Sequence, residues 1–171
     1  MIPYILLTVI LVVIDQVSKA YMVEFLSSQP NLTFPVIEGF FHFTYVRNPG
    51  VVFGIGGDAG LPLLFFIVTG LLAIGIFSYY LVKTDFKDKR LWVYHLGLAL
   101  LIAGAAGNLI DRVVQVDHRV IDFLDFRGIW GYIFNVADMC LSVGITVFLV
   151  DQLLLEPKRR KPSVESSGTD I

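Results

Sequence analysis

Four stretches of this sequence are each long and apolar enough to cross a lipid bilayer. About 20 residues of α-helix, at ~1.5 Å per residue, span the ~30 Å hydrocarbon core of a membrane. We therefore predict membrane-spanning helices at about residues 2–23, 61–82, 91–110 and 134–150. The second and third stretches contain no Asp, Glu, Lys or Arg. Such segments exclude an ordinary soluble domain as the fold of this chain.

The composition agrees with a membrane protein. Of the 171 residues, 56% are hydrophobic and 16% are charged, whereas globular domains carry ~25% charged residues. The net charge of −2 lacks the basic excess of a nucleic-acid-binding protein, so no nucleic acid is expected as a partner. We predict one integral-membrane domain over residues 1–156, surrounded by membrane lipids and acting as a monomer. Residues 157–171, which are polar and end the chain, are predicted to form a disordered cytoplasmic tail.

Basic residues are distributed unevenly between the predicted loops. The loop after the second span and the C-terminal tail together carry eight of them: Lys83, Lys87, Lys89, Arg90, Lys158, Arg159, Arg160 and Lys161. The opposite side carries four: Arg47, Arg112, Arg119 and Arg127. Because short cytoplasmic loops are enriched in Lys and Arg, both termini are predicted to lie in the cytoplasm. Segments 24–60 and 111–133 then face outward.

These outward segments have the patterns of folded structure rather than of plain linkers. Residues 41–45, Phe-His-Phe-Thr-Tyr, alternate aromatic with polar side chains, which is typical of a half-buried strand. Residues 120–126, Val-Ile-Asp-Phe-Leu-Asp-Phe, place carboxylates between large apolar side chains, which favours a segment on the membrane surface. The predicted fold is a membrane all-α core of four transmembrane helices with a small periplasmic β-sheet and a short amphipathic segment.

Small residues recur along the third predicted span. Gly97, Gly104 and the Ala103-x-x-x-Gly107 pattern allow another helix backbone to approach closely. The pattern therefore predicts a helix-packing seam on this span.

Ionisable residues in or beside the predicted spans are costly and are usually functional. Asp15 and Lys19 are four residues apart, so they share one helix face and can form an ion pair, which could be purely structural. Asn108, Asp111 and Arg112 end the third span, where a charged cluster is often an interface anchor.

A second carboxylate is expected close to Asp138 at the outer boundary of the membrane. Asp138 begins the fourth span, and the segment that precedes this span carries Asp122 and Asp125. Each carboxylate could instead be solvated or cap a helix, because Asp is common near helix N-termini. The pattern does not distinguish Asp122 from Asp125 as the partner of Asp138.

Most catalytic chemistries lack their residues in this chain. Cys140 is the single cysteine and lies in an apolar run, where a buried hydrophobic role is usual. With no Ser-His or Cys-His set and no histidine cluster for zinc, neither a metal nor another cofactor is expected.

Two close carboxylates cannot both ionise cheaply, so they share a proton. One of them can then activate water while the other protonates a carbonyl oxygen, as in aspartic peptidases.

Five blocks of residues, in order along the chain, resemble the lipoprotein signal peptidase family (signal peptidase II, aspartic peptidase family A8). The blocks are Asp15-Gln16-x-x-Lys19, Asn48-x-Gly50-x-x-Phe53-Gly54, Gly104-x-x-Gly107-Asn108-x-x-Asp111-Arg112, Val120-x-Asp122-Phe123 and Phe134-Asn135-x-Ala137-Asp138. The resemblance extends over nearly the whole chain, to about residue 155. It implies a four-helix aspartic peptidase of the bacterial inner membrane, with its active site at the periplasmic face.

The resemblance also implies roles for individual residues. Asp122 and Asp138 match the catalytic dyad of the family. The positions that line or support its site correspond to Asn48, Gly50, Asn108, Arg112, Asn135, Asp15 and Lys19. The implied substrate is a prolipoprotein whose cysteine already carries diacylglycerol, and the cut falls just before that cysteine. Val51 and Val52 depart from the small residues that the family tends to have at this point.

Two other classes of function fit part of the sequence. A proton-coupled small transporter or channel subunit could use Asp15, Lys19 and Asp138 as a relay, although most of the polar residues gather at the outer boundary rather than at the midplane. A non-catalytic membrane scaffold would need no second carboxylate beside Asp138.

Overall fold

The computed structural model describes residues 1–50 and 63–160. Within this part of the chain, four helices are long and apolar enough to cross a membrane. They contain α1 (Ile2–Ser27), α2 (Leu63–Lys83), α3 (Trp92–Val114) and α4 (Val136–Val150). Hydrocarbon offers no hydrogen-bond partners, and an α-helix pairs its backbone N–H and C=O groups with one another. The predicted helical membrane core is confirmed, and the protein is a multi-pass membrane protein.

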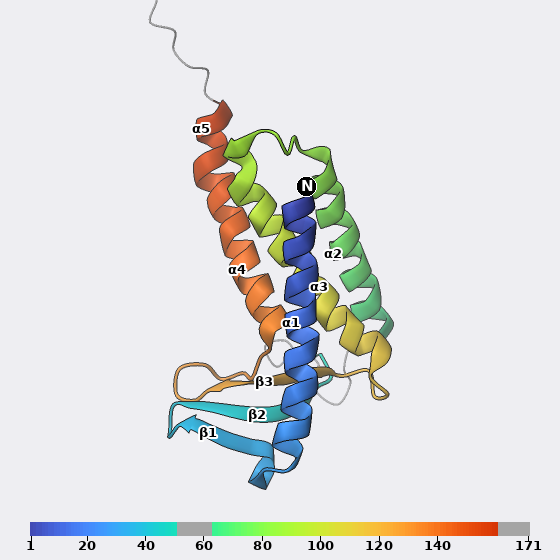
Figure 1. Cartoon of the computed structure of the whole chain (residues 1–171), viewed down its shortest axis with the longest axis vertical. Coiled ribbons are helices and arrows are strands. Elements are labelled where there is room, and N and C mark those ends of the chain that lie inside the picture. Colours follow the sequence, from blue (N-terminus) through green and yellow to red (C-terminus); the bar gives the residue numbers. More distant parts are fainter. Residues whose placement is uncertain (51–62, 161–171) are drawn as a thin grey trace, which may run out of the picture.

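Helix α3 is the central helix of the bundle (Figure 1). In its most apolar stretch 61% of the residues are buried, against 11% in α1 and 6% in α2. The outer helices instead expose large apolar side chains such as Val17 and Leu64, which are 62% and 69% exposed. A surface of this kind is suited to lipid rather than to water.

The predicted packing seam on α3 is present, and α4 lies against it. A Cβ atom added to Gly97 would lie 2.9 Å from the backbone nitrogen of Phe148. One added to Gly104 would lie 2.5 Å from the carbonyl oxygen of Ala137. Glycine is required at both positions because the two helix backbones approach too closely for any side chain.

A small antiparallel sheet lies at one end of the bundle, where the lower part of α1 packs against it (Figure 1). Within the described residues its strand order is β1 (Thr33–Ile37), β2 (Phe41–Asn48) and β3 (Val120–Phe126). The predicted strand at residues 41–45 is confirmed as part of β2.

Residues 120–126, for which the sequence predicts a segment on the membrane surface, form strand β3. One edge of β3 pairs with β2, and its other edge makes a bridge between Leu124 and Phe134. Residues 120–123 are buried. The segment therefore has its backbone hydrogen bonds satisfied within the protein, and its alternating side chains are covered on both faces.

Two helices run further than the sequence predicts at the sheet end of the molecule. Helix α1 continues to Ser27 and α3 to Val114. The last turns of α1 pack on the sheet: Leu26 is completely buried, and the rings of Phe25 and Phe34 have centroids 5.3 Å apart. Packing against the sheet extends these helices beyond the apolar runs that predicted them. The short helix η1 (Pro30–Leu32) connects α1 to β1.

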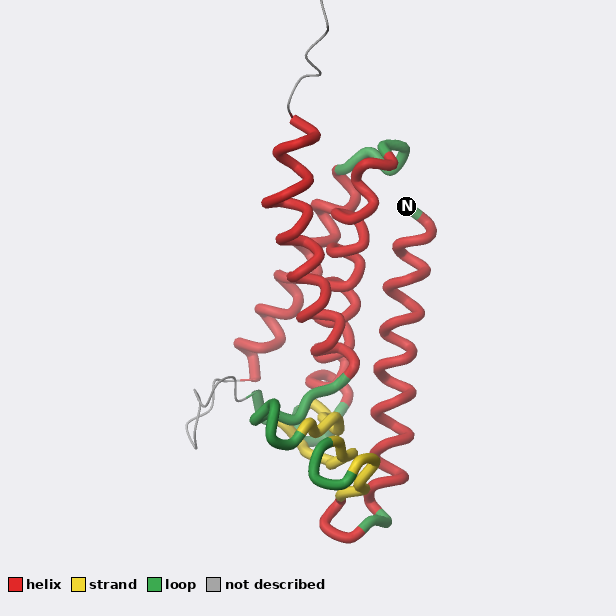
Figure 2. The backbone as a smooth tube through the Cα atoms, turned by 90° about the vertical axis from the view of Figure 1, so that its left-hand side faces the viewer, coloured by secondary structure: helices red, strands yellow, loops and turns green. Residues whose placement is uncertain are grey.

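At the opposite end, helix α4 continues without a break through η3 (Asp151–Leu155), a π-helical turn, and α5 (Glu156–Arg160). The predicted tail begins at residue 157, yet residues 157–160 are helical. Arg159 stabilises this extension by donating to both carboxylate oxygens of Asp151, at 2.8 and 2.6 Å. The N-terminus, α5 and the loop containing η2 (Lys89–Leu91) lie at this end, far from the sheet (Figures 1 and 2). The remaining tail residues and Val51-Val52 fall outside the described residues.

Candidate active site

Asp122 and Asp138 come together through a shared asparagine where β3 meets the start of α4. The Nδ2 of Asn135 donates to Oδ1 of Asp122 at 2.7 Å. The Oδ1 of the same residue accepts from the backbone N–H of Asp138 at 2.9 Å. Asn135 is completely buried, so this bridge is shielded from solvent. The expectation that two carboxylates lie close together is therefore met by Asp122 and Asp138.

Asp138 is both a helix-capping residue and a member of this site. Asn135 is the N-cap of α4, and its backbone N–H donates to Oδ2 of Asp138 at 3.2 Å, which completes a capping box. The other carboxylate oxygen, Oδ1, accepts from Nδ2 of Asn108 at 2.7 Å. The capping role and the site role, which the sequence presents as alternatives, are combined in one side chain.

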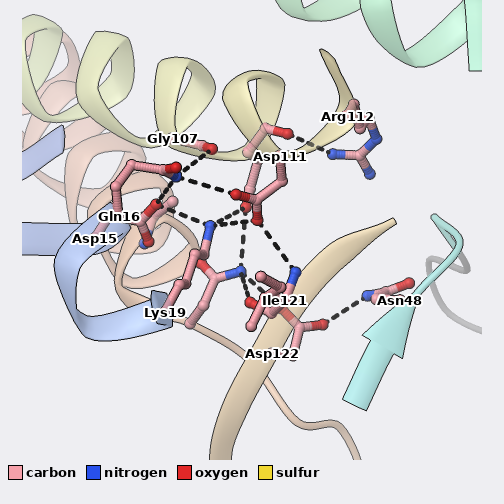
Figure 3. A network of polar contacts seen from close by, with 12 residues as sticks. Asp15, Gln16, Lys19, Asn48, Gly107, Asp111, Arg112, Ile121 and Asp122 are labelled. Carbon is pink, nitrogen blue, oxygen red and sulfur yellow. Dashed lines mark hydrogen bonds and ion pairs between the residues drawn. The ribbon is translucent and has the colours of Figure 1, made fainter. Parts of the chain in front are cut away.

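Asp122 is also held by Asn48, the last residue of β2. The Nδ2 of Asn48 donates to Oδ2 of Asp122 at 2.9 Å (Figure 3). The Oδ1 of Asn48 accepts from the backbone N–H of Gly50 at 2.8 Å, which fixes the orientation of the amide. Gly50 has a φ of +101°, and a Cβ atom there would lie 2.3 Å from Cζ of Phe66. Only glycine combines this backbone conformation with this close approach.

The surroundings of Asp122 favour its protonated form. Burial is the largest cause and the charge of Asp138 the second, and together they raise the pKa of Asp122 to about 7. The hydrogen bonds from Asn48 and Asn135 and the charge of Lys19 act in the opposite direction but do not cancel these effects. At neutral pH the carboxylate pair therefore retains a proton that exposed carboxylates would have lost.

Asp125 lies on the other face of β3. Residues three apart in a strand point in opposite directions. Its Oδ2 accepts from Oγ1 of Thr44 at 2.8 Å and from Nε of Arg127 at 3.0 Å. Of the two aspartates that the sequence pattern leaves open, the structure therefore joins Asp122, and not Asp125, to Asp138 through Asn135.

A buried ion cluster supports the site from α1 and α3 (Figure 3). The predicted pair is confirmed, with Nζ of Lys19 2.8 Å from Oδ2 of Asp15. The same ammonium is 2.8 Å from Oδ2 of Asp111, and the side chains of all three residues are 1% exposed. Nε2 of Gln16 links the two carboxylates, donating to Oδ2 of Asp15 and Oδ1 of Asp111 at 3.0 Å each.

Gln16 and Asp111 are the members of this network that the sequence analysis did not assign to the site. Both lie within the quoted motif blocks, and Asp111 follows Asn108 by one helical turn. Their polar character at helix positions next to assigned residues is the signal that could have identified them.

Arg112 lies at the edge of the site. Its Nη1 donates to the carbonyl oxygen of Asn108 at 3.2 Å, and its guanidinium lies 4.6 Å from the ring centroid of Phe66. Both side chains line a hollow of about 340 Å³. The other predicted site residues in its wall are Asn48, Gly50, Asn108 and Asp138.

A second hollow is also lined by Asp138. It has a volume of about 430 Å³, and its walls are mainly apolar. Its lining includes Phe126, Trp130, Phe134 and Met139 together with Asp138. Asp138 therefore lines two hollows, and both offer apolar side chains beside its carboxylate.

Cys140, also on α4, is buried, with 6% of its surface exposed. Two of the three histidines of the chain are engaged elsewhere. A ring nitrogen of His95 lies 2.7 Å from Oγ1 of Thr84, and one of His118 lies 2.9 Å from the carbonyl oxygen of Arg112. Within residues 1–50 and 63–160, no group of three His, Cys, Asp or Glu side chains is placed to hold a metal ion. The carboxylate pair is thus the arrangement in the described residues that is suited to acid–base chemistry.

Comparisons with known proteins show the family of this chain. The family model described as signal peptidase (SPase) II matches residues 7–154. The lipoprotein signal peptidase of Fusobacterium nucleatum is 39% identical over 158 residues, covering 92% of this chain and 90% of that protein. The lipoprotein signal peptidase of Moorella thermoacetica is 45% identical over 153 residues, covering 90% of this chain and 93% of that protein.

Solved structures show the same fold. A bacterial membrane enzyme structure at 2.3 Å resolution superposes with a TM-score of 0.78 and 28% identity, covering 100% of this chain and 95% of that one. A second, at 1.9 Å resolution, has a TM-score of 0.74 and 29% identity, covering 90% and 94%. The chain therefore belongs to the signal peptidase II family of proteases.

Proposed function

We propose that this protein is a membrane aspartic endopeptidase that removes signal peptides from diacylglyceryl-modified prolipoproteins, cutting directly before the lipidated cysteine. Family membership and the names of the relatives support the reaction and the class of substrate. The observation that carries the proposal is the pair of Asp122 and Asp138, joined through buried Asn135 at the edge of two apolar hollows.

The catalytic cycle follows from one proton shared by two carboxylates. In the proposed reaction Asp122 holds the proton and Asp138 is ionised, and a water molecule lies between them and the scissile carbonyl. Asp138 takes a proton from this water, and the water oxygen bonds to the carbonyl carbon. At the same time Asp122 protonates the carbonyl oxygen. As the gem-diol collapses and the C–N bond breaks, Asp138 gives its proton to the leaving nitrogen, while Asp122 takes a proton from one of the two hydroxyls, which restores the starting protonation of the pair.

The asparagines keep the dyad in position during this cycle. Asn48 donates to Asp122, Asn108 donates to Asp138, and Asn135 contacts both. An asparagine amide does not titrate near neutral pH, so these donors persist while the proton moves. Held donors of this kind stabilise developing charge without reorganisation.

The apolar walls beside the dyad suit a substrate that remains in the bilayer. A signal peptide and a diacylglyceryl group are both apolar, whereas the bond to be cut is polar. We propose that this bond reaches Asp138 while apolar parts of the substrate occupy the flanking hollows.

We further propose that the protein resides in the bacterial inner membrane as a monomer, with both termini in the cytoplasm and the active site at the periplasmic face. The basic asymmetry of the loops supports this orientation. A cysteine placed at exposed Ser28, in a Cys140→Ser background, should react with an impermeant thiol reagent in cells with a permeable outer membrane. One placed at exposed Lys87 should react only after lysis, and the reverse pattern would contradict the orientation.

The function is tested with the purified protein in detergent. One precursor peptide carries diacylglycerol on its cysteine, and a matched peptide of the same sequence does not. The expected result is cleavage of the lipidated peptide alone, on the amino side of the cysteine. Equal cleavage of both peptides would overturn the proposed substrate class, and no cleavage of either would overturn the peptidase function.

A proton relay through Asp15, Lys19 and Asp138 is not favoured. The Lys19 ammonium is fixed between two carboxylates and is almost completely buried, so it lacks the open, water-accessible path that a relay across the membrane needs.

A further inference from the structure

We propose that Lys19 is a positioning residue that sets the separation of Asp122 and Asp138 by joining two carboxylate clamps, one on each side of the dyad. The inference rests on the proposed function, because it concerns the geometry of the same pair. Lys19 touches neither the substrate nor the reacting atoms and acts through other residues.

Each clamp holds the peptide group next to one member of the dyad. The Oδ1 of Asp15 accepts from the backbone N–H of Ala137, the residue before Asp138, at 2.8 Å. The Oδ2 of Asp111 accepts from the backbone N–H of Ile121, the residue before Asp122, at 3.1 Å. The start of α4 is thereby tied to α1, and strand β3 is tied to α3.

Lys19 joins these clamps into one unit. Its Nζ lies 2.8 Å from Oδ2 of Asp15 and 2.8 Å from Oδ2 of Asp111, with all three side chains buried (Figure 3). A displacement of either clamp would therefore break a short, desolvated ion pair. A Cβ atom on Gly107 would lie 2.6 Å from Oδ2 of Asp15, so glycine leaves the space that this carboxylate occupies.

The ammonium also orients one of the asparagines that hold the dyad. Nζ of Lys19 donates to Oδ1 of Asn108 at 3.3 Å. With its oxygen directed toward Lys19, the amide of Asn108 presents Nδ2 to Asp138, 2.7 Å away. Lys19 therefore helps to position Asp138 in two ways, through Asp15 and the backbone N–H of Ala137, and through the amide of Asn108.

Stability alone does not account for the arrangement. Replacing a buried ion cluster with well-packed apolar groups is often neutral or stabilising, so burial of the charge is weak evidence for a stabilising role. Geometry is far less forgiving, since a displacement of about 1 Å at a catalytic group can reduce the rate about 10²-fold. A lysine that connects the supports of both catalytic aspartates acts on the catalytic rate, through the geometry of the pair.

The test compares two variants that lack the Lys19 charge with a control variant that lacks an ion pair elsewhere in the molecule. Lys19→Met keeps the length of the side chain and removes the ammonium. Lys19→Met/Asp111→Asn also removes one of the carboxylates left unpaired, which permits folding if the single variant does not accumulate. The control is Asp151→Asn/Arg159→Met, which removes the ion pair between buried Asp151 and half-buried Arg159 at the opposite end of the molecule.

Cleavage of the lipidated precursor by folded, purified protein is then measured. Both Lys19 variants should lose about 10–100-fold in kcat, with KM changed by less than about threefold, because the dyad is displaced while the hollows remain. The control should have a lower Tm with kcat and KM unchanged. A kcat within twofold of wild type in either Lys19 variant, or a change confined to KM, would overturn the proposal.

The pH profile supplies a readout that loss of stability would not move. The charged groups that act on Asp122 include Asp138, Lys19 and Arg112, and the charge of Lys19 lowers the pKa of Asp122. In Lys19→Met the pH above which kcat/KM declines should therefore rise, whereas the control should keep the wild-type profile. An unchanged profile in Lys19→Met would contradict the proposal.

Failure of the proposed function would look different. Asp122→Asn is assayed in parallel and should be inactive. If Asp122→Asn cleaves like the wild type, the dyad assignment is wrong; if it is inactive while Lys19→Met is fully active, the assignment stands and the positioning role is wrong.

Discussion

The two ends of the helix bundle both bury charged side chains, but they balance the charges differently. At the end remote from the sheet, completely buried Asp151 receives two hydrogen bonds from one arginine, Arg159. At the sheet end, the carboxylates outnumber the buried cations that contact them: Asp15, Asp111 and Asp122 are buried and Asp138 is half-buried, and Lys19 is the buried cation among them. A balanced pair is chemically inert, whereas an excess of carboxylates in a dry site must bind a proton, and that proton is what acid–base catalysis uses.

Substituting one aspartate at each end should give opposite phenotypes. Asp138→Asn removes the proposed base without changing the shape of the side chain, and loss of general acid–base catalysis typically reduces rates about 10²–10⁴-fold. We expect cleavage to fall at least this far, whereas the Tm should fall only modestly, because the amide oxygen can still accept from one of the two donors that hold Asp138. Asp151→Asn should leave cleavage intact and reduce the free energy of unfolding by about 1.5–3 kcal/mol, the usual worth of a hydrogen bond to a charged group.

Both variants are measured by cleavage of the lipidated precursor and by thermal unfolding in the same detergent. Wild-type cleavage by Asp138→Asn would remove the functional difference between the two ends. A loss of activity in folded Asp151→Asn would show that the remote end also takes part in catalysis.

The shared proton should appear in the pH dependence of cleavage. Burial and the charge of Asp138 raise the pKa of Asp122 to about 7. Above this value Asp122 loses its proton, so kcat/KM should decline about tenfold per pH unit, as expected for a single essential acid. The same shift makes the folded protein less stable as the pH rises from about 4 to 7, because the folded state retains a proton that the unfolded state releases. A flat kcat/KM profile from pH 6 to 9 would contradict the assignment of Asp122 as the acid.

Glycines on the two sides of β2 offer a sharper comparison within the sheet end. Gly50 has positive φ and touches the ring of Phe66, whereas Gly39 has positive φ with open space around it. Gly50→Ala should displace the turn that orients Asn48 and reduce cleavage by about 10-fold, a fraction of the 10²-fold that a full 1 Å displacement can produce. Gly39→Ala carries backbone strain of about 1–2 kcal/mol but should leave kcat unchanged. Equal effects on kcat would mean that strain rather than the contact with Phe66 is responsible.

The smallest effect is expected at Cys140. It is buried two residues beyond Asp138, so on a helix its side chain points about 200° away from that carboxylate. Cys140→Ser should cleave at close to the wild-type rate, and thiol-blocking reagents should not inhibit the protein. Loss of cleavage in both experiments would indicate a cysteine mechanism instead.

The helices and the first-helix ion pair could be predicted because they depend on local periodicity. Long apolar runs predict the spans, and the spacing of four between Asp15 and Lys19 places both on one helix face. The alternation in residues 41–45 predicts β2 for the same reason. These features require no knowledge of which segments meet in space.

The parts that could not be predicted depend on contacts between distant segments. Residues 120–126 resemble a membrane-surface segment because nothing in their own sequence shows that β2 and Phe134 pair with both edges. The role of Asp111 depends on the N–H of Ile121 and on Lys19 from another helix. The choice of Asp122 over Asp125 by geometry needs the sheet register and the position of Asn135, which only the folded chain supplies.

The most direct test of the central claim compares two substitutions on one strand. Asp122 and Asp125 are both buried in β3, but Asp122 contacts Asn135 and Asn48 while Asp125 contacts Thr44 and Arg127. The measurement is cleavage of the lipidated precursor by folded Asp122→Asn and Asp125→Asn. We expect no measurable cleavage by Asp122→Asn and substantial cleavage by Asp125→Asn. Activity in Asp122→Asn together with inactivity in Asp125→Asn would contradict the proposed dyad, and full activity in both would contradict the aspartic peptidase mechanism itself.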